Sequence, residues 1–326
     1  MGLLQNFLGL TNFRNPLLRT LVPSVSAAFA IQTAFAVPSI LAQSDRFYDA
    51  SGAMTFLSVT LLSMYLPSLR TRSAAALKGT DIKLPSLMSA FTGGGASGGF
   101  NWRQVALGAA VAFWSIRLGS YLFQRVLQTG SDSRFDKIKK SPAKFLVAWI
   151  AQATWVSLCL MPVIAISAIP PAAFSALPRL KPTDVLGLAL YVGGFAFEMV
   201  ADRQKSKWMQ ERREKVHEEQ FITRGLWSKS QYPNYFGECT LWTGIATTAA
   251  GVLVTRPAQV GLGLSGGLPG QMLALGLSSI SPAFVTFLLL KVSGVPLSEK
   301  KYDKRYGDRK DYQEWKKNTP KFFPRL

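Results

Sequence analysis

The sequence predicts an all-α integral membrane protein, a polytopic bundle of about seven transmembrane helices. Apolar residues make up 48% of the 326 residues and gather in long blocks. A helix needs about 20 mostly apolar residues to cross the hydrocarbon core, and no block alternates as barrel strands do. Helices are expected because they satisfy their own backbone hydrogen bonds in lipid. The seven blocks are residues 20–42, 50–69, 104–126, 145–169, 184–204, 237–255 and 271–292.

The charge balance fits a membrane protein better than a nucleic-acid-binding one. The formal net charge is +19, from 37 Lys and Arg against 18 Asp and Glu. Such a balance can indicate a nucleic-acid partner, but the apolar blocks argue against one. Seven crossings place most of the basic residues on one side, in 42–49, 126–144, 205–236 and the C-terminal tail. The positive-inside rule predicts that this side, with the C-terminus, faces the cytosol.

The N-terminal part, 1–101, is predicted to hold two transmembrane helices and a polar, glycine-rich loop. Residues 1–19 contain Arg14 and Arg19 and no acid, which is compatible with a weak organellar address. Without a clear cleavage site, an uncleaved first helix is favoured. Residues 93–98 match G-x-G-x-x-G, but a dinucleotide fingerprint needs a preceding strand. We therefore expect no dinucleotide site in this loop.

Charged residues inside or beside the expected spans are candidates for a polar cavity. Arg117 lies within 104–126, and helical spacing places Tyr121 on its face. A charge in a span is costly, so Arg117 either pairs structurally or points into a cavity. Glu198 and Asp202, four residues apart, share a face at the end of 184–204. They either pair with an arginine or hydrogen-bond a ligand.

The segment that follows is dense in charges. Residues 205–222 are expected to form a solvated amphipathic helix. His217, the single histidine, lies in this run, and we expect it to face solvent rather than act as a general base. Two cysteines, Cys159 and Cys239, lie in apolar blocks and are expected to pack as small apolar residues. Two thiols provide neither a disulfide framework nor a metal site.

The stretch from Thr223 to Glu238 concentrates aromatic, glycine and polar residues before an apolar block. The planar fork of Arg224 suits a phosphate, and Gly225 lets the backbone approach a ligand. Trp227 and Tyr235 could stack on a planar ring. After Pro233, Asn234 could cap the helix or bond a carboxamide. Composition alone favours a capped interfacial turn with an aromatic belt.

Several runs resemble signatures of the steroid 5α-reductase-like membrane proteins, including their uncharacterised branch. More distantly, the chain resembles sterol reductases and isoprenylcysteine carboxyl methyltransferases. The resemblance covers roughly 102–326, which it implies is one membrane domain with a cytosolic tail. Relatives often carry Arg-His-Pro where this chain has Gln231-Tyr232-Pro233, so no role of that histidine is expected. The matching runs are residues 117–125, 130–135, 224–238 and 293–299, with Tyr306, Tyr312, Thr319 and Pro320 after them.

The resemblance implies an NADPH-dependent reductase of an activated C=C bond in a steroid- or lipid-like enone, in the endoplasmic reticulum membrane. Hydride would pass to the carbon β to a carbonyl whose oxygen a donor polarises. The implied catalytic residues are Tyr235, Tyr121 and Glu238, and Arg117 and Glu198 would face the substrate. The implied cofactor residues are Asp202, Arg224, Gly225, Trp227, Asn234, Tyr235, Glu238, Tyr302, Arg305 and Tyr306.

The sequence is also compatible with other functions and locations. An S-adenosylmethionine-dependent methyltransferase of a lipidic substrate is one alternative, although its motif uses the missing histidine. A non-catalytic lipid-binding protein is another. Membrane lipids are expected partners in every case, and the mitochondrial membrane is the alternative location. The basic, tyrosine-rich tail after residue 293 could close over the phosphates of the cofactor or bind lipid headgroups.

Overall fold

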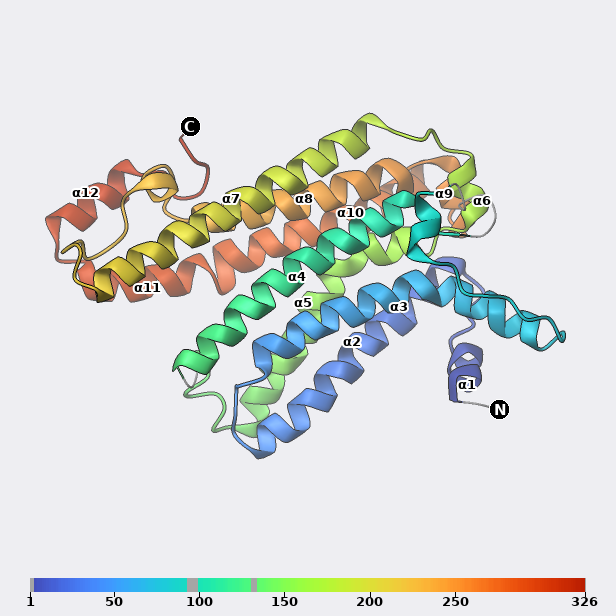
Figure 1. Cartoon of the computed structure of the whole chain (residues 1–326), viewed down its shortest axis with the longest axis horizontal. Helices are drawn as coiled ribbons and strands as arrows, with labels where there is room; N and C mark the ends of the chain where they lie inside the picture. The colour runs from blue at the N-terminus through green and yellow to red at the C-terminus, as the bar shows by residue number, and fades with distance from the viewer. Residues whose placement is uncertain (1–2, 93–98, 130–133, 326) are drawn as a thin grey trace. The chain divides into compact units, whose positions relative to one another are not determined.

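The computed structural model describes residues 3–92, 99–129 and 134–325, and within these ranges it is helical without strands. Residues 93–98 of the glycine-rich loop and 130–133 of one matching run lie outside the described residues. Figure 1 shows the course of the helices. The helices are α1 Leu3–Leu10, α2 Pro16–Leu41, α3 Tyr48–Ala76, η1 Leu87–Ala90, α4 Trp102–Thr129, α5 Pro142–Ser167, α6 Pro171–Ser175, α7 Pro182–Arg213, η3 Gly225–Ser228, α8 Pro233–Leu253, α9 Arg256–Gly261, α10 Leu268–Phe287, the π-helical turn η4 Leu288–Val292, α11 Val295–Tyr306 and α12 Lys310–Asn318.

Among the described residues, six helical segments are long and apolar enough to cross a membrane, by length and composition. This agrees with a polytopic helical membrane protein. The seventh expected span, 237–255, is also helical, as α8, but it is not one of the six. Glu238 and several threonines dilute its apolar run. The six are Pro16–Leu41, Tyr48–Ala76, Trp102–Gln124, Pro142–Ser167, Pro182–Arg213 and Leu268–Tyr306.

The chain forms two compact units, of which the first comprises residues 1–183 and 248–281. In this unit α2 packs against α3 and α5, and α3 also packs against α4 and α5 (Figure 1). Polar bonds join these helices as well: Gln32 Nε2 donates to Thr55 Oγ1 at 2.7 Å, and Gln152 Nε2 donates to the Tyr48 carbonyl at 3.0 Å. The division of the chain after residue 101 follows the extent of the family resemblance and stays a prediction. The compact unit is a different grouping, because it holds α2 to α5 together.

The second compact unit comprises residues 184–247 and 282–326. Its helices α7 and α8 meet through glycines that lack a Cβ. A Cβ on Gly237 would lie 2.6 Å from the Glu198 backbone nitrogen, and one on Gly194 would lie 2.5 Å from the Leu241 nitrogen. A Cβ on Gly244 would likewise lie 2.5 Å from the Gly187 carbonyl oxygen. The two backbones therefore lie in direct contact along this face.

Helix α7 continues past the expected end at residue 204 and ends at Arg213. Its polar last turns extend a helix whose apolar part ends earlier. An amphipathic helix was expected through residue 222. The helix ends at Arg213 instead, because Lys215 adopts a left-handed conformation, with φ of 58°. The Val216 amide donates to the Glu211 carbonyl at 2.9 Å, closing the helix end. The chain then reverses, and residues 217–222 are not helical.

Candidate functional site

The corner between α7 and α8 is built around Gly225 and Gln204. Gly225 has φ of +62°, and a Cβ there would lie 2.5 Å from Gln204 Oε1. The same Oε1 accepts a hydrogen bond from the Leu226 amide at 2.8 Å. Only glycine fits this left-handed, crowded position. The close approach expected at Gly225 is therefore made to a glutamine of α7.

Arg224 lies beside a small cavity of about 210 Å³ and is balanced by two acids. Its guanidinium is ion-paired with Glu211 and approaches Glu219 at 3.7 Å. Lys207 also lies 3.8 Å from Glu211. The cavity wall thus carries two cations and one carboxylate. It is lined by Gln204, Lys207, Trp208, Glu211, Ile222, Arg224 and Gly225.

Trp227 is a packing residue of this corner. Its side chain is buried with Trp208 and Ile222. The indole Nε1 donates to the Ala201 carbonyl at 3.0 Å, and Lys205 Nζ lies 4.7 Å from the ring centre. A stacking ligand would have to displace these neighbours. Stacking of Trp227 on a cofactor ring stays a prediction.

His217 does not face solvent, so that prediction was wrong. Its side chain is only 13% exposed. The imidazole stacks on Trp208 with ring centres 5.2 Å apart, and Nε2 lies 3.2 Å from the Trp208 carbonyl oxygen. The reversal at Lys215 carries the histidine back along α7, where a flat ring covers the indole. The charge density of the surrounding sequence gave no indication of this contact.

At the start of α8, two tyrosines stack and an amide oxygen is left without a partner. The rings of Tyr232 and Tyr235 are nearly parallel, with centres 5.6 Å apart. Burial raises the pKa of Tyr232 well above its ordinary value. Asn234 Oδ1 is buried and accepts no hydrogen bond from the described residues. Buried polar atoms normally have partners, so this oxygen is an unsatisfied acceptor within the described chain.

The three candidate acids lie on the facing helices of the same unit. Glu198 is buried, and Asp202 and Glu238 are half-buried. The close α7–α8 contact at Gly237 sets the Glu198 backbone beside the first turns of α8. Glu198 therefore adjoins the first turns of α8, which contain Asn234 and Tyr235.

The tyrosines of the C-terminal part have separate positions. Tyr306 is buried, and its hydroxyl donates to the Gln220 carbonyl at 2.7 Å. Tyr302 is half-buried and lines a narrow aromatic cavity with Tyr232, Tyr312 and Trp315. Arg305 is exposed, 5.3 Å from the Tyr306 ring centre. Tyr306 therefore holds the 217–222 segment in place, while Arg305 is exposed to solvent.

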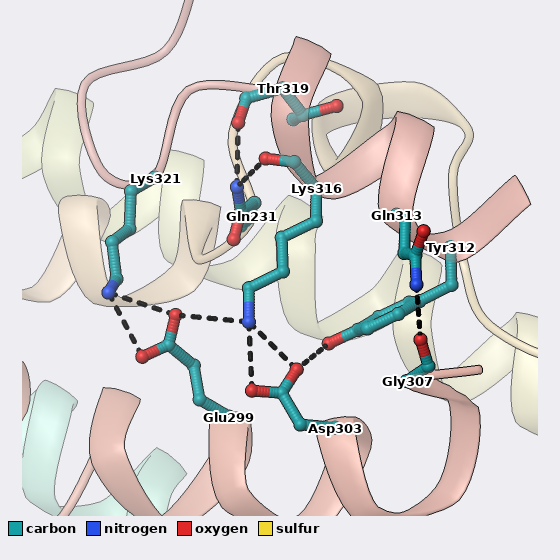
Figure 2. A network of polar contacts seen from close by, with 9 residues as sticks. All are labelled: Gln231, Glu299, Asp303, Gly307, Tyr312, Gln313, Lys316, Thr319 and Lys321. Atoms are coloured by element: carbon teal, nitrogen blue, oxygen red, sulfur yellow. Dashed lines mark hydrogen bonds and ion pairs between the residues drawn. The ribbon is translucent and has the colours of Figure 1, made fainter. Parts of the chain in front are cut away.

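Gln231 fastens the C-terminal tail to the corner. Its Nε2 donates to the Lys316 and Thr319 carbonyls at 2.8 and 2.7 Å, and its backbone amide donates to the Pro320 carbonyl at 2.9 Å. Ser230 Oγ donates to the Phe322 carbonyl at 3.0 Å. Gln231 is thus the attachment point of the tail (Figure 2).

Ion pairs add to this attachment, as Figure 2 shows. Lys316 Nζ lies 2.7 Å from Asp303 Oδ1, and Lys321 Nζ lies 2.9 Å from Glu299 Oε1. The Tyr312 hydroxyl donates to Asp303 at 2.8 Å. The two acids of α11 thus face α12 and the tail. Sequence reasoning missed Gln204, Gln231, Glu299 and Asp303 as organising residues.

The structure groups most of the expected site residues in the second unit. Arg117 and Tyr121 belong to the other unit, where Tyr121 is exposed and Arg117 is half-buried. That Arg117 and Tyr121 share one site with the residues of the second unit stays a prediction. No group of three or more His, Cys, Asp or Glu side chains that could hold a metal occurs among the described residues. The members in the second unit are Glu198, Asp202, Arg224, Gly225, Trp227, Asn234, Tyr235, Glu238, Tyr302, Arg305 and Tyr306.

Comparison with known proteins gives one family match. The model of the family described as protein of unknown function, DUF1295, matches residues 72–263 and 267–319. The two segments include α4 to α12 and the whole corner. No curated protein and no solved structure matches the chain.

Proposed function

The chain belongs to the DUF1295 family, the family of steroid 5α-reductase-like proteins, and from that premise we propose that it is a membrane-embedded reductase. In this proposal NADPH reduces an activated C=C bond of a steroid- or lipid-like enone. The observation that carries it is the corner cavity, which Arg224, Lys207 and Gly225 line. Asn234 and Tyr235 do not line this cavity, but they follow in the same unit, at the start of α8.

The donor set suits the phosphate end of the cofactor. Arg224 and Lys207 are cations beside a cavity of about 210 Å³, and an arginine fork binds phosphate with two bonds. Whole-ligand pockets generally measure about 300–1,000 Å³, so this cavity takes one end of a dinucleotide. A phosphate would compete with Glu211 for Arg224. We therefore expect binding to free that carboxylate.

The turn at the start of α8 suits the nicotinamide end. Asn234 Oδ1 is buried without a partner in the described chain and can accept from a carboxamide N–H. NADPH, when bound, supplies the hydride. We assign to Tyr235 Oη the hydrogen bond to the substrate carbonyl oxygen, where negative charge develops. Tyr121 is the alternative donor, Glu238 supports the cofactor or the donor, and Arg117 and Glu198 contact the substrate.

Cofactor binding tests the proposal directly. The purified chain, in detergent, is titrated with NADPH, and energy transfer from tryptophan to the nicotinamide is followed. We expect saturable transfer in the wild type and a loss of about tenfold or more in affinity for Arg224→Ala, because charge-assisted bonds to phosphate are strong. Arg213→Ala, an exposed arginine at the end of the same α7, is the matched control. Unchanged fluorescence in the wild type would refute the proposal.

A non-catalytic lipid-binding protein is the second candidate, and one observation favours it. Arg224, Trp227 and Tyr306 are all engaged in contacts within the chain. If these residues serve only the fold, neither NADPH nor S-adenosylmethionine should bind. S-adenosylmethionine has no nicotinamide to accept the energy, so its binding is measured by titration calorimetry, which separates a methyltransferase from both alternatives. Binding of S-adenosylmethionine in preference to NADPH would select that third function.

The proposed location is the endoplasmic reticulum membrane with a cytosolic C-terminus. The basic corner and tail are expected on the cytosolic side by the positive-inside rule, where NADPH is accessible. A C-terminal epitope should be digested by protease added to sealed microsomes. Protection of the epitope, or its recovery in mitochondria, would contradict this location.

A further inference from the structure

A second cavity, of about 570 Å³, lies where α1, the start of α2 and the end of α3 meet, within the first unit. It is separate from the corner residues and is not used by the proposed reaction. Two arginines and several neutral polar side chains line it, and none of its described lining residues is acidic. Its polar lining includes Gln5, Asn12, Arg19, Arg70, Thr71 and Ser73.

Arg70 holds the N-terminal segment against α3. Its terminal nitrogens donate to the Leu8 carbonyl at 2.7 Å, to the Thr11 carbonyl at 2.9 Å and to the Arg19 carbonyl at 3.0 Å. Its Nε is buried and has no hydrogen-bond partner among the described residues. A buried N–H without a partner is costly. The terminal nitrogens of Arg70, which also donate to Thr11 Oγ1 at 2.8 Å, are therefore taken up by the N-terminal segment. The positive charge of Arg70 remains in the cavity wall.

Arg19 has most of its hydrogen-bonding capacity unused. Its Nε donates to the Phe13 carbonyl at 2.5 Å. Its two terminal nitrogens make no further hydrogen bond or ion pair to the described part of the chain, and Arg19 and Arg70 line the same cavity. Like charges in one cavity repel. Asp81, which follows α3 in the chain and does not line the cavity, pairs with Arg72 at 3.8 Å.

We propose that this cavity binds the phosphate headgroup of an anionic membrane phospholipid, with Arg19 and Arg70 as its cationic ligands. The terminal nitrogens of Arg19 match phosphate geometry, and Arg70 adds a second positive charge to the cavity wall. The cavity lies where one candidate span begins and another ends, and the ends of a span reach the headgroup region of a bilayer. Leu10 and Leu77, in the adjoining helix end and C-cap, are 84% and 73% exposed. These two leucines provide apolar surface for the glycerol and acyl parts of a phospholipid. Inorganic phosphate has no such parts.

The test measures the thermal unfolding midpoint of the delipidated full chain in detergent. The probes are phosphatidic acid, phosphatidylcholine and inorganic phosphate, each added alone. We expect phosphatidic acid to raise the midpoint more than phosphatidylcholine does. Arg19→Gln should weaken the phosphatidic acid dependence about tenfold, the loss expected for a charge-assisted pair. The matched controls Arg14→Gln and Arg72→Gln, both exposed, should respond like the wild type.

Each outcome decides the proposal. If inorganic phosphate alone gives the Arg19-dependent shift, the anion site is supported and its ligand is free phosphate. Equal effects of both lipids, or equal losses in Arg19→Gln and both controls, overturn it. Arg19→Lys, which keeps the charge without the fork, should show an intermediate response. Native mass spectrometry of retained lipid provides a second readout if Arg19→Gln changes the unliganded midpoint.

Discussion

The corner after α7 and the cavity beside α1 both place arginines near a cavity, but they balance the charge differently. In the corner, Arg224 lies against Glu211 and Glu219. In the N-terminal cavity, Arg19 and Arg70 have no acidic partner among the described residues. A balanced arginine is already held in the folded chain, so a ligand must compete for it. An unbalanced pair is stabilised by any anion that enters.

The largest expected effect tests what holds the corner together. Gly237→Ala places a Cβ 2.6 Å from the Glu198 backbone nitrogen, and overpacking against backbone should cost about 3 kcal/mol. Gly193→Ala, on α7 with no atom within 4 Å of its Cβ, should be neutral or stabilising by up to about 1 kcal/mol. Thermal unfolding in detergent measures both. Equal stability of the two variants would show that α7 and α8 are not in contact.

Gln231→Ala should have the next largest effect. It removes two bonds and leaves the buried Thr319 backbone without its donor, at a cost of about 2 kcal/mol. Residues 319–325 should then be cut sooner by carboxypeptidase. Gln313→Ala, which loses one exposed bond to Gly307, is the control. A tail equally resistant in both variants would exclude Gln231 as its attachment.

Charge removal should change stability in opposite directions in the two regions. Arg224→Ala leaves Glu211 and Glu219 unbalanced and should cost about 0.5 kcal/mol, as exposed pairs do. Arg19→Gln relieves repulsion and should stabilise the unliganded chain by a similar amount, about 0.5 kcal/mol. Both differences should shrink in 1 M salt, because screening weakens exposed interactions. Equal signs at low salt would remove the contrast between the regions.

The smallest effect concerns alkaline pH. Burial, followed by the hydrogen bond to Asp303, raises the pKa of Tyr312 above its ordinary value near 10. The folded chain then holds this proton more tightly than the unfolded chain. Stability should therefore decline as pH rises above about 10, where the unfolded tyrosine ionises. Tyr312→Phe should flatten this decline relative to Tyr121→Phe, and unfolding midpoints between pH 8 and 11 would measure it.

Local composition predicted the helices better than it predicted the contacts. Apolar blocks of about 20 residues marked the spans, because lipid requires that length. A helix was expected over 205–222, but local composition did not show that it continues α7 without a break or that it ends at Arg213. Gly225 was expected to allow a close approach, but its partner Gln204 is 21 positions earlier. Gln231 and Asp303 contact residues that lie many positions away in the chain. Local composition carries no signal for such contacts.

A crossed binding experiment on two variants tests most directly whether the corner is a cofactor site. NADPH affinity and phosphatidic acid affinity are measured for the wild type, Arg224→Ala and Arg19→Gln in the same detergent. The account predicts that Arg224→Ala loses NADPH and keeps the lipid, while Arg19→Gln loses the lipid and keeps NADPH. No NADPH binding by any of the three proteins, or NADPH binding unaffected by Arg224→Ala, would contradict the assignment of the corner as a cofactor site.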